Sequence, residues 1–288
     1  MTTRKIVLAV LIGFGVAGCV TTQPNRLSPQ DMVGRPQNAV LVQAPMLVDN
    51  ATLHNLFAPD LAENSPESRD AVGNAVDKAQ ARALAYMRSA IESQTGIRII
   101  NSEGVTRAVD ELRINDTQNI ITKEVAEQLR AVSGADAILR FRITDYGVTP
   151  KSWRNRVIVF EVISTLAIAA IAYAKPATRP IAGAYLVTEA IEETAEAYAG
   201  FWALDEIYRP VRIEAELIML DTGIQAWKSS ATGFSDMGLT RLVRKVSVTE
   251  RDAQLGSAIH EAVNDIVADL QKVLPEGAPR FDDNALGK

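Results

Sequence analysis

Two stretches of alternating apolar and polar residues constrain the fold of this chain most strongly. In residues 137–146 and 211–219, every second side chain is apolar. Because successive side chains of a strand point to opposite faces, both stretches predict strands with one buried face. A glycine-containing turn at 221–223 joins the second stretch to a partner strand at 224–234. The inward residues of the two stretches are Leu139, Phe141, Ile143, Val211, Ile213, Ala215, Leu217 and Met219.

Helical spacing of apolar residues marks four further stretches. Between residues 76 and 93 apolar side chains return every four positions, and Gly96 ends the pattern. Ser102 and Thr122 are typical N-caps, and each predicts a helix that follows it. Val105, Leu129 and Val132 are among the side chains expected to face inward from these two helices. The clearest periodicity runs from about Asp252 until Pro275 and predicts a long terminal helix.

The order of elements predicts an α+β fold. Short apolar runs at 39–42 and 97–100 supply two more strands, while 50–74 is predicted to be a loop with some short helix. Half-buried strands with helices covering one face favour a two-layer α/β sandwich over residues 38–275. A helical hairpin is predicted as an insertion at 153–208, and 276–288 is predicted to be a loose tail.

The other face of the predicted sheet carries charges. Arg140 and Arg142 lie on one strand, and Glu214 and Glu216 lie on another. If these strands are neighbours, the charges can pair across the sheet, each pair contributing a few tenths of a kcal/mol. Such a face is either solvated or a surface for a partner.

Composition excludes several classes of function. The 288 residues are 47% hydrophobic and carry a net charge of −5, which makes an electrostatic nucleic-acid binder a poor candidate. The one cysteine cannot form an intramolecular disulfide or a cysteine-rich metal site. This cysteine, Cys19, follows a basic start and a short apolar run, which together are typical of a secretory signal.

The segment Val16-Ala17-Gly18-Cys19 resembles the lipobox of bacterial lipoproteins. The resemblance implies that residues 1–18 are removed as a signal peptide and that Cys19 is acylated, which anchors the chain in a membrane. Val20, in place of an aspartate after the cysteine, then implies the periplasmic face of the outer membrane if the cell is Gram-negative. Residues 19–37 are predicted to be a flexible tether. The alternative is an ordinary signal peptide with a chance cysteine.

Three segments resemble CsgG-like lipoproteins, whose fold is related to the amino-terminal domain of TolB. They are Thr95-Gly96-Ile97-Arg98-Ile99-Ile100-Asn101, the run from Leu129 through Gly134-Ala135-Asp136 to Leu139, and the hairpin from Ile218 to Trp227. The resemblance implies an envelope lipoprotein of a kind that includes ring and channel components. It carries over no catalytic residues.

The insertion at 153–208 departs from that family, whose membrane-crossing insertions are β-hairpins. Fourteen of the 17 residues from Val157 to Tyr173 are hydrophobic, and an Ala- and Glu-rich second arm follows a proline turn. Packing on the chain's own core, self-association and membrane contact are three interpretations of the apolar arm. The oligomer or membrane contacts are expected at Val157, Phe160, Ile163, Leu166, Ile168 and Ile171.

Candidate reactive sites are weak. Glu189, Glu192, Glu193 and Glu196 share the second arm, but bridged metal sites in helical bundles normally add histidines, and the hairpin has none. His260-Glu261 begins a zinc-protease motif that Asn264 leaves incomplete. We therefore expect no catalytic residue, no metal and no cofactor. The sequence predicts a non-enzymatic assembly, scaffold or secretion component, homo-oligomeric or bound to other envelope proteins. The alternative is a periplasmic binding module for an apolar or glycan ligand.

Overall fold

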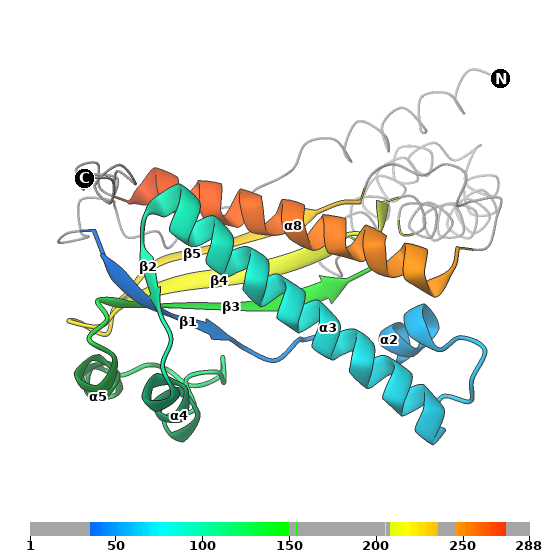
Figure 1. Cartoon of the computed structure of the whole chain (residues 1–288), viewed down its shortest axis with the longest axis horizontal. Coiled ribbons are helices and arrows are strands. Elements are labelled where there is room, and N and C mark those ends of the chain that lie inside the picture. Colours follow the sequence, from blue (N-terminus) through cyan, green and yellow to red (C-terminus); the bar gives the residue numbers. More distant parts are fainter. Residues whose placement is uncertain (1–34, 150–153, 155–204, 206–207, 236–245, 275–288) are drawn as a thin grey trace, which may run out of the picture.

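The computed structural model describes residues 35–149, 154, 205, 208–235 and 246–274, which form a mixed five-stranded sheet with helices on both faces (Figure 1). The strand order is β2-β1-β3-β4-β5. β1 is parallel to β2 and β3, whereas β4 is antiparallel to β3 and β5. The strands are β1 (Asn38–Gln43), β2 (Arg98–Ile100), β3 (Ala137–Tyr146), β4 (Val211–Met219) and β5 (Gln225–Gly233). The α+β class and these strands agree with the sequence pattern.

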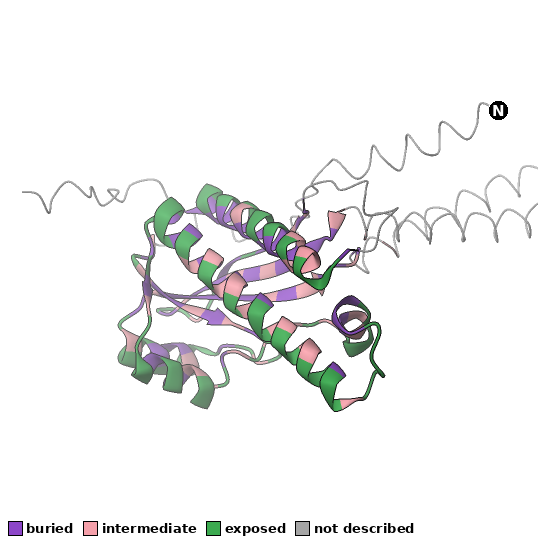
Figure 2. Ribbon diagram, turned by 45° about the vertical axis from the view of Figure 1, so that its right-hand side comes forward, coloured by how far each residue is buried: buried purple, intermediate pink, exposed green. Residues whose placement is uncertain are grey.

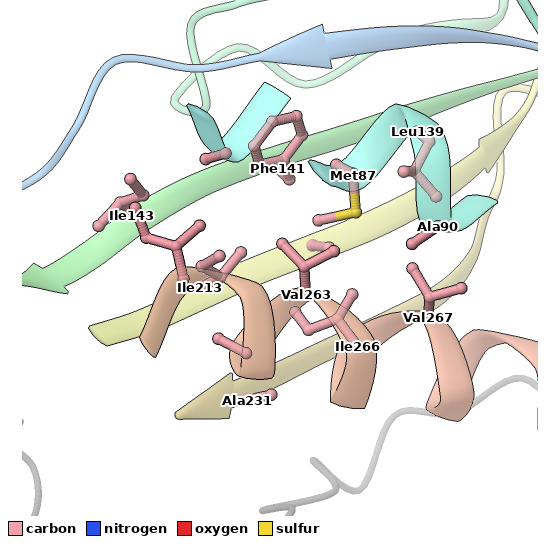
Figure 3. Packing of buried hydrophobic residues seen from close by; sticks show 14 of the residues in the cluster. Met87, Ala90, Leu139, Phe141, Ile143, Ile213, Ala231, Val263, Ile266 and Val267 are labelled. Carbon is pink, nitrogen blue, oxygen red and sulfur yellow. The ribbon is translucent and has the colours of Figure 1, made fainter. Parts of the chain in front are cut away.

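The main core lies between the sheet and two long helices, α3 (Pro66–Ala90) and α8 (Val248–Val273). The short helix α2 (Asn50–Phe57) joins the same core. Figure 3 shows Met87 of α3 and Val263 of α8 pointing toward Phe141 on β3. The purple inner sides of both helices in Figure 2 show the buried stripe, and the green outer sides face water. The alternating residues predicted to point inward therefore build this core.

A second, smaller core lies on the opposite face of the sheet. The helices α4 (Glu103–Glu111) and α5 (Lys123–Ser133) pack against Val40 and Val42 of β1 and Ile138 of β3. Both helices lie beyond the sheet from α3 and α8 in Figure 1. The sequence placed helices on one face only, so the two-layer description is incomplete. The physical reason is that β1 and the start of β3 are apolar on both faces.

Helix boundaries follow capping residues. Ser102 and Thr122 cap α4 and α5 as predicted. However, α3 begins at Pro66 rather than near Val76, because the Ser65 side chain accepts a hydrogen bond from the Ser68 N–H at its first turn. Similarly, Ser247 and Glu250 form a capping box, which starts α8 before Asp252. In α5, Val132 is exposed, and Ala126 is buried beside Leu129 instead.

Several predicted features lie outside the described residues. They are the signal peptide and Cys19, the tether up to residue 34, the hairpin contacts Val157, Phe160, Ile163, Leu166, Ile168 and Ile171, and the tail at 276–288. Among the described helices, none combines the length and the apolar character that a membrane span requires.

Candidate functional site: the charged face of the sheet

Two ion pairs cross from β3 to β4 on the sheet face opposite α3 and α8. Arg140 lies opposite Glu216 in the strand register, and its Nε is 2.6 Å from a Glu216 carboxylate oxygen. Two residues further along β3, Arg142 lies opposite Glu214, and its Nη2 is 3.1 Å from the Glu214 carboxylate. The cross-strand pairing predicted from the sequence is therefore confirmed. The two pairs differ in burial, because the Arg140 side chain is 6% exposed and that of Arg142 is 21% exposed.

Arg140 also organises the loop between α4 and α5. Its Nη1 donates to the backbone carbonyls of Ile114, Asp116 and Asn119, at 3.1, 2.9 and 3.3 Å. Arg142 reaches the same loop through a 2.8 Å hydrogen bond from its Nη1 to the Thr117 hydroxyl. A guanidinium presents its donors in a fixed planar fork, so these contacts hold the loop in one position against the sheet.

The held loop forms one wall of an open groove. A hollow of about 390 Å³ lies between the loop and the strands, and its lining includes Thr117, Asn119 and Lys228. A second hollow of about 310 Å³ continues toward α2 and is lined by Asp49, Thr52 and Arg212 among others. Arg142 and Glu214 border both hollows, so the two form one groove across the charged face.

Aliphatic side chains stand exposed at the ends of this groove. Ile120, at the tip of the loop, is 86% exposed, and Leu47 lines the other end. Ile224 is also exposed and follows Gly223, at which an added Cβ would lie 3.0 Å from the Lys123 backbone. The positive φ of Gly223 and this close approach fix the hairpin turn against the start of α5. The face thus combines a polar floor with fixed aliphatic ends.

Hydrogen bonds occupy the charged side chains of this face. Its arginines and glutamates are engaged with one another, and the described residues contain no group of three His, Cys, Asp or Glu side chains that could hold a metal ion. His260 lies away from the groove, exposed on α8, where its ring meets Tyr86 edge-on at 5.1 Å. The groove therefore offers hydrogen-bonding side chains and exposed aliphatic groups.

Thr149, Arg154 and Asp205 form a polar cluster beside the end of β3 and the start of β4. The Asp205 carboxylate accepts hydrogen bonds from the Thr149 N–H and hydroxyl, and it pairs with Arg154 at 2.6 Å. Burial raises the pKa of Asp205, against the lowering effect of Thr149 and Arg154. Beside this polar cluster, the Gly147 N–H donates a hydrogen bond to the Pro210 carbonyl at 2.7 Å. Thr149 and Arg154 are therefore joined to Asp205 at the β3–β4 end of the sheet.

No family model matches the chain, and no curated protein matches it. Among solved structures, it is similar to the lipoprotein GNA1162 from Neisseria meningitidis, at 13% identity and a TM-score of 0.31, over 81% of this chain and 99% of that chain. It is also similar to the PelC dodecamer from Paraburkholderia phytofirmans, at 10% identity and a TM-score of 0.30, over 84% of this chain and 92% of that chain. These values are too low to assign a family. The resemblance to CsgG-like proteins stays a prediction.

Proposed function

We propose that this chain is a lipid-anchored protein of the outer membrane that works without catalysis, as an oligomeric assembly, scaffold or secretion component of an envelope complex. The observation that carries the proposal is the charged face of the sheet. There, a buried arginine holds a loop in place and the loop exposes Ile120 almost completely. Ile120 and Leu47 expose aliphatic surface along the two hollows, and a contact with another protein would remove that surface from water.

The anchor is proposed from the lipobox residues that end at Cys19. Fractionation of the envelope tests it, because the parent chain is expected in the outer-membrane fraction with acyl mass on its amino-terminal residue. Cys19→Ser removes the acylated thiol and is expected to move the chain out of that fraction. A Cys19→Ser chain that stays in the outer-membrane fraction would contradict the proposed anchor.

The apolar arm is proposed as one contact between copies, through the side chains from Val157 to Ile171 predicted above. Excision tests it, because Arg154 and Asp205 form an ion pair at 2.6 Å and a short turn can therefore connect them. Replacing residues 155–204 with such a turn is expected to lower the mass of the detergent-extracted oligomer. An unchanged mass would refute the contact and leave the anchor unaffected.

A periplasmic binding module is the second candidate function. The two adjoining hollows favour it, because their lining offers many hydrogen-bonding groups of the kind that a glycan uses. Protein purified from its native envelope is then expected to carry a small molecule that mass spectrometry identifies, and Lys228→Ala is expected to reduce its occupancy. Protein that is consistently empty would count against this candidate.

A further inference from the structure

The two edges of the sheet differ in length. β2 forms one edge with three residues, whereas β5 forms the other with nine. Long edge strands offer unpaired N–H and C=O groups to other strands, and proteins usually block them with proline, charge or very short length. β5 contains no proline and one charged residue, Lys228. It is therefore the edge of this sheet that is built for pairing.

Hydrogen bonds at the β4–β5 turn show which groups of β5 point outward. The Met219 N–H donates to the Ile224 carbonyl, so Met219 and every second residue before it point toward β5. Leu217 faces Trp227, which makes Trp227, Ser229 and Ala231 the residues of β5 that bond to β4. The backbone groups of Lys228, Ser230 and Thr232 consequently point to the free edge. Within the described part of the chain, no backbone hydrogen bond beyond the β4–β5 ladder involves these three residues.

We propose that β5 pairs antiparallel with β5 of a second copy of this chain, about a two-fold axis at Ser230. This inference rests on the proposed function, because it names the surface through which copies meet. The arrangement places Ser230 opposite Ser230 of the second copy and Lys228 opposite Thr232. Each of these outward residues then exchanges two backbone hydrogen bonds with its opposite number. The two sheets become one continuous sheet.

Charge disfavours the registers that are centred nearer to Lys228. A pairing about Lys228 would place two ammonium groups on Cβ atoms about 5 Å apart, which is destabilising. A pairing about Ser229 leaves the two lysines diagonal to each other and makes fewer backbone bonds. Pairing about Ser230 places each Lys228 opposite Thr232 of the other copy, so the two lysines lie further apart along the strands. It also sets small side chains opposite one another, with Ser229 facing Ala231.

Helix α8 packs directly on the edge strand β5. An added Cβ at Gly233 would lie 2.1 Å from the Ala258 carbonyl oxygen, and the Trp227 indole donates to Asp269 at 3.2 Å, so α8 runs along β5. In the paired state the two α8 helices lie antiparallel beside each other. Glu261 lies against the end of β5, where its carboxylate accepts a hydrogen bond from the Phe234 N–H.

Cysteine cross-linking in the intact envelope tests the axis. Ser230→Cys places two thiols on residues whose Cα atoms lie about 5.5 Å apart, which is within the Cα–Cα range of disulfides. Mild oxidation is expected to convert most of the chain to a disulfide-linked dimer. The matched control is Ser93→Cys, exposed away from β5 and expected to stay monomeric on a non-reducing gel. The parent chain, oxidised in the same way, shows whether any cross-link forms through Cys19. A Ser230→Cys chain that cross-links no more than Ser93→Cys would overturn the pairing.

Two further variants separate pairing from folding. Ser230→Pro removes an N–H that points to the free edge and leaves the ladder to β4 intact. Ser230→Ala keeps that N–H and loses only the hydroxyl that accepts from Arg212. We expect Ser230→Pro to lower the mass of the extracted oligomer at least twofold, with Ser230→Ala unchanged and circular dichroism the same in both. If the parent is oligomeric and Ser230→Pro leaves its mass unaltered, the β5 pairing fails alone. If the parent is monomeric, the proposed oligomer fails as well.

Discussion

Replacing Arg140 is expected to destabilise the fold more than any other single change on the charged face. Arg140→Met keeps an unbranched apolar stem and removes the guanidinium. Glu216 then loses a partner at 2.6 Å while remaining 14% exposed, and the carbonyls of Ile114, Asp116 and Asn119 lose their shared donor. Removing one partner of a buried ion pair costs about 3–5 kcal/mol, because the other charge stays buried without compensation.

Arg142→Met is the matched control. Arg142 lies on the same strand and makes the same type of ion pair with Glu214. Its side chain is 21% exposed, so water remains available to Glu214 as an alternative partner. Its loss is expected to cost about 1 kcal/mol or less. Equilibrium urea unfolding of the three chains, followed by circular dichroism, measures both free energies. Equal costs for Arg140→Met and Arg142→Met would refute the idea that burial makes Arg140 special.

Two further changes test packing and charge. Gly233→Ala is expected to cost about 3 kcal/mol of unfolding free energy, since its Cβ would lie 2.1 Å from the Ala258 carbonyl oxygen; a thermal melt equal to the parent's would contradict this. Asp252 pairs with Lys78 and Arg82, and although burial raises its pKa, the hydrogen bonds from these two residues lower it overall. The stability it contributes is present above the unfolded-state pKa of about 4 and is lost as pH falls through the folded-state value. Asp252→Asn is therefore expected to be less stable than the parent at pH 7, with a difference that shrinks below pH 4 in urea titrations.

The parts of the fold that depend on local pattern were predictable. The alternation in β3 and β4 identified the strands and their buried face. Ser102, Thr122 and the positive-φ residues Gly96 and Gly223 marked real caps and turns. Where boundaries were wrong, a capping signal was present and overlooked, as with Ser65 before Pro66 at the start of α3.

The candidate site was predictable only in part. Sequence alternation put Arg140 on the outer face, yet the side chain is buried, because the loop after α4 folds over it. Nothing local in that loop predicts the contact, which joins residues more than twenty positions apart. The equal spacing of Arg140 and Arg142 with Glu214 and Glu216 was the one available signal, and it predicted the pairing but not the groove.

The central claim is that this chain acts as a lipid-anchored oligomer. Native mass spectrometry of the full-length protein, extracted from its own membrane in a mild detergent, tests this claim most directly, because one spectrum reports both acyl mass and copy number. The account predicts an acylated chain in a multimer that contains an even number of copies. A monomer, or a chain that retains residues 1–18 and carries no acyl mass on Cys19, would contradict it.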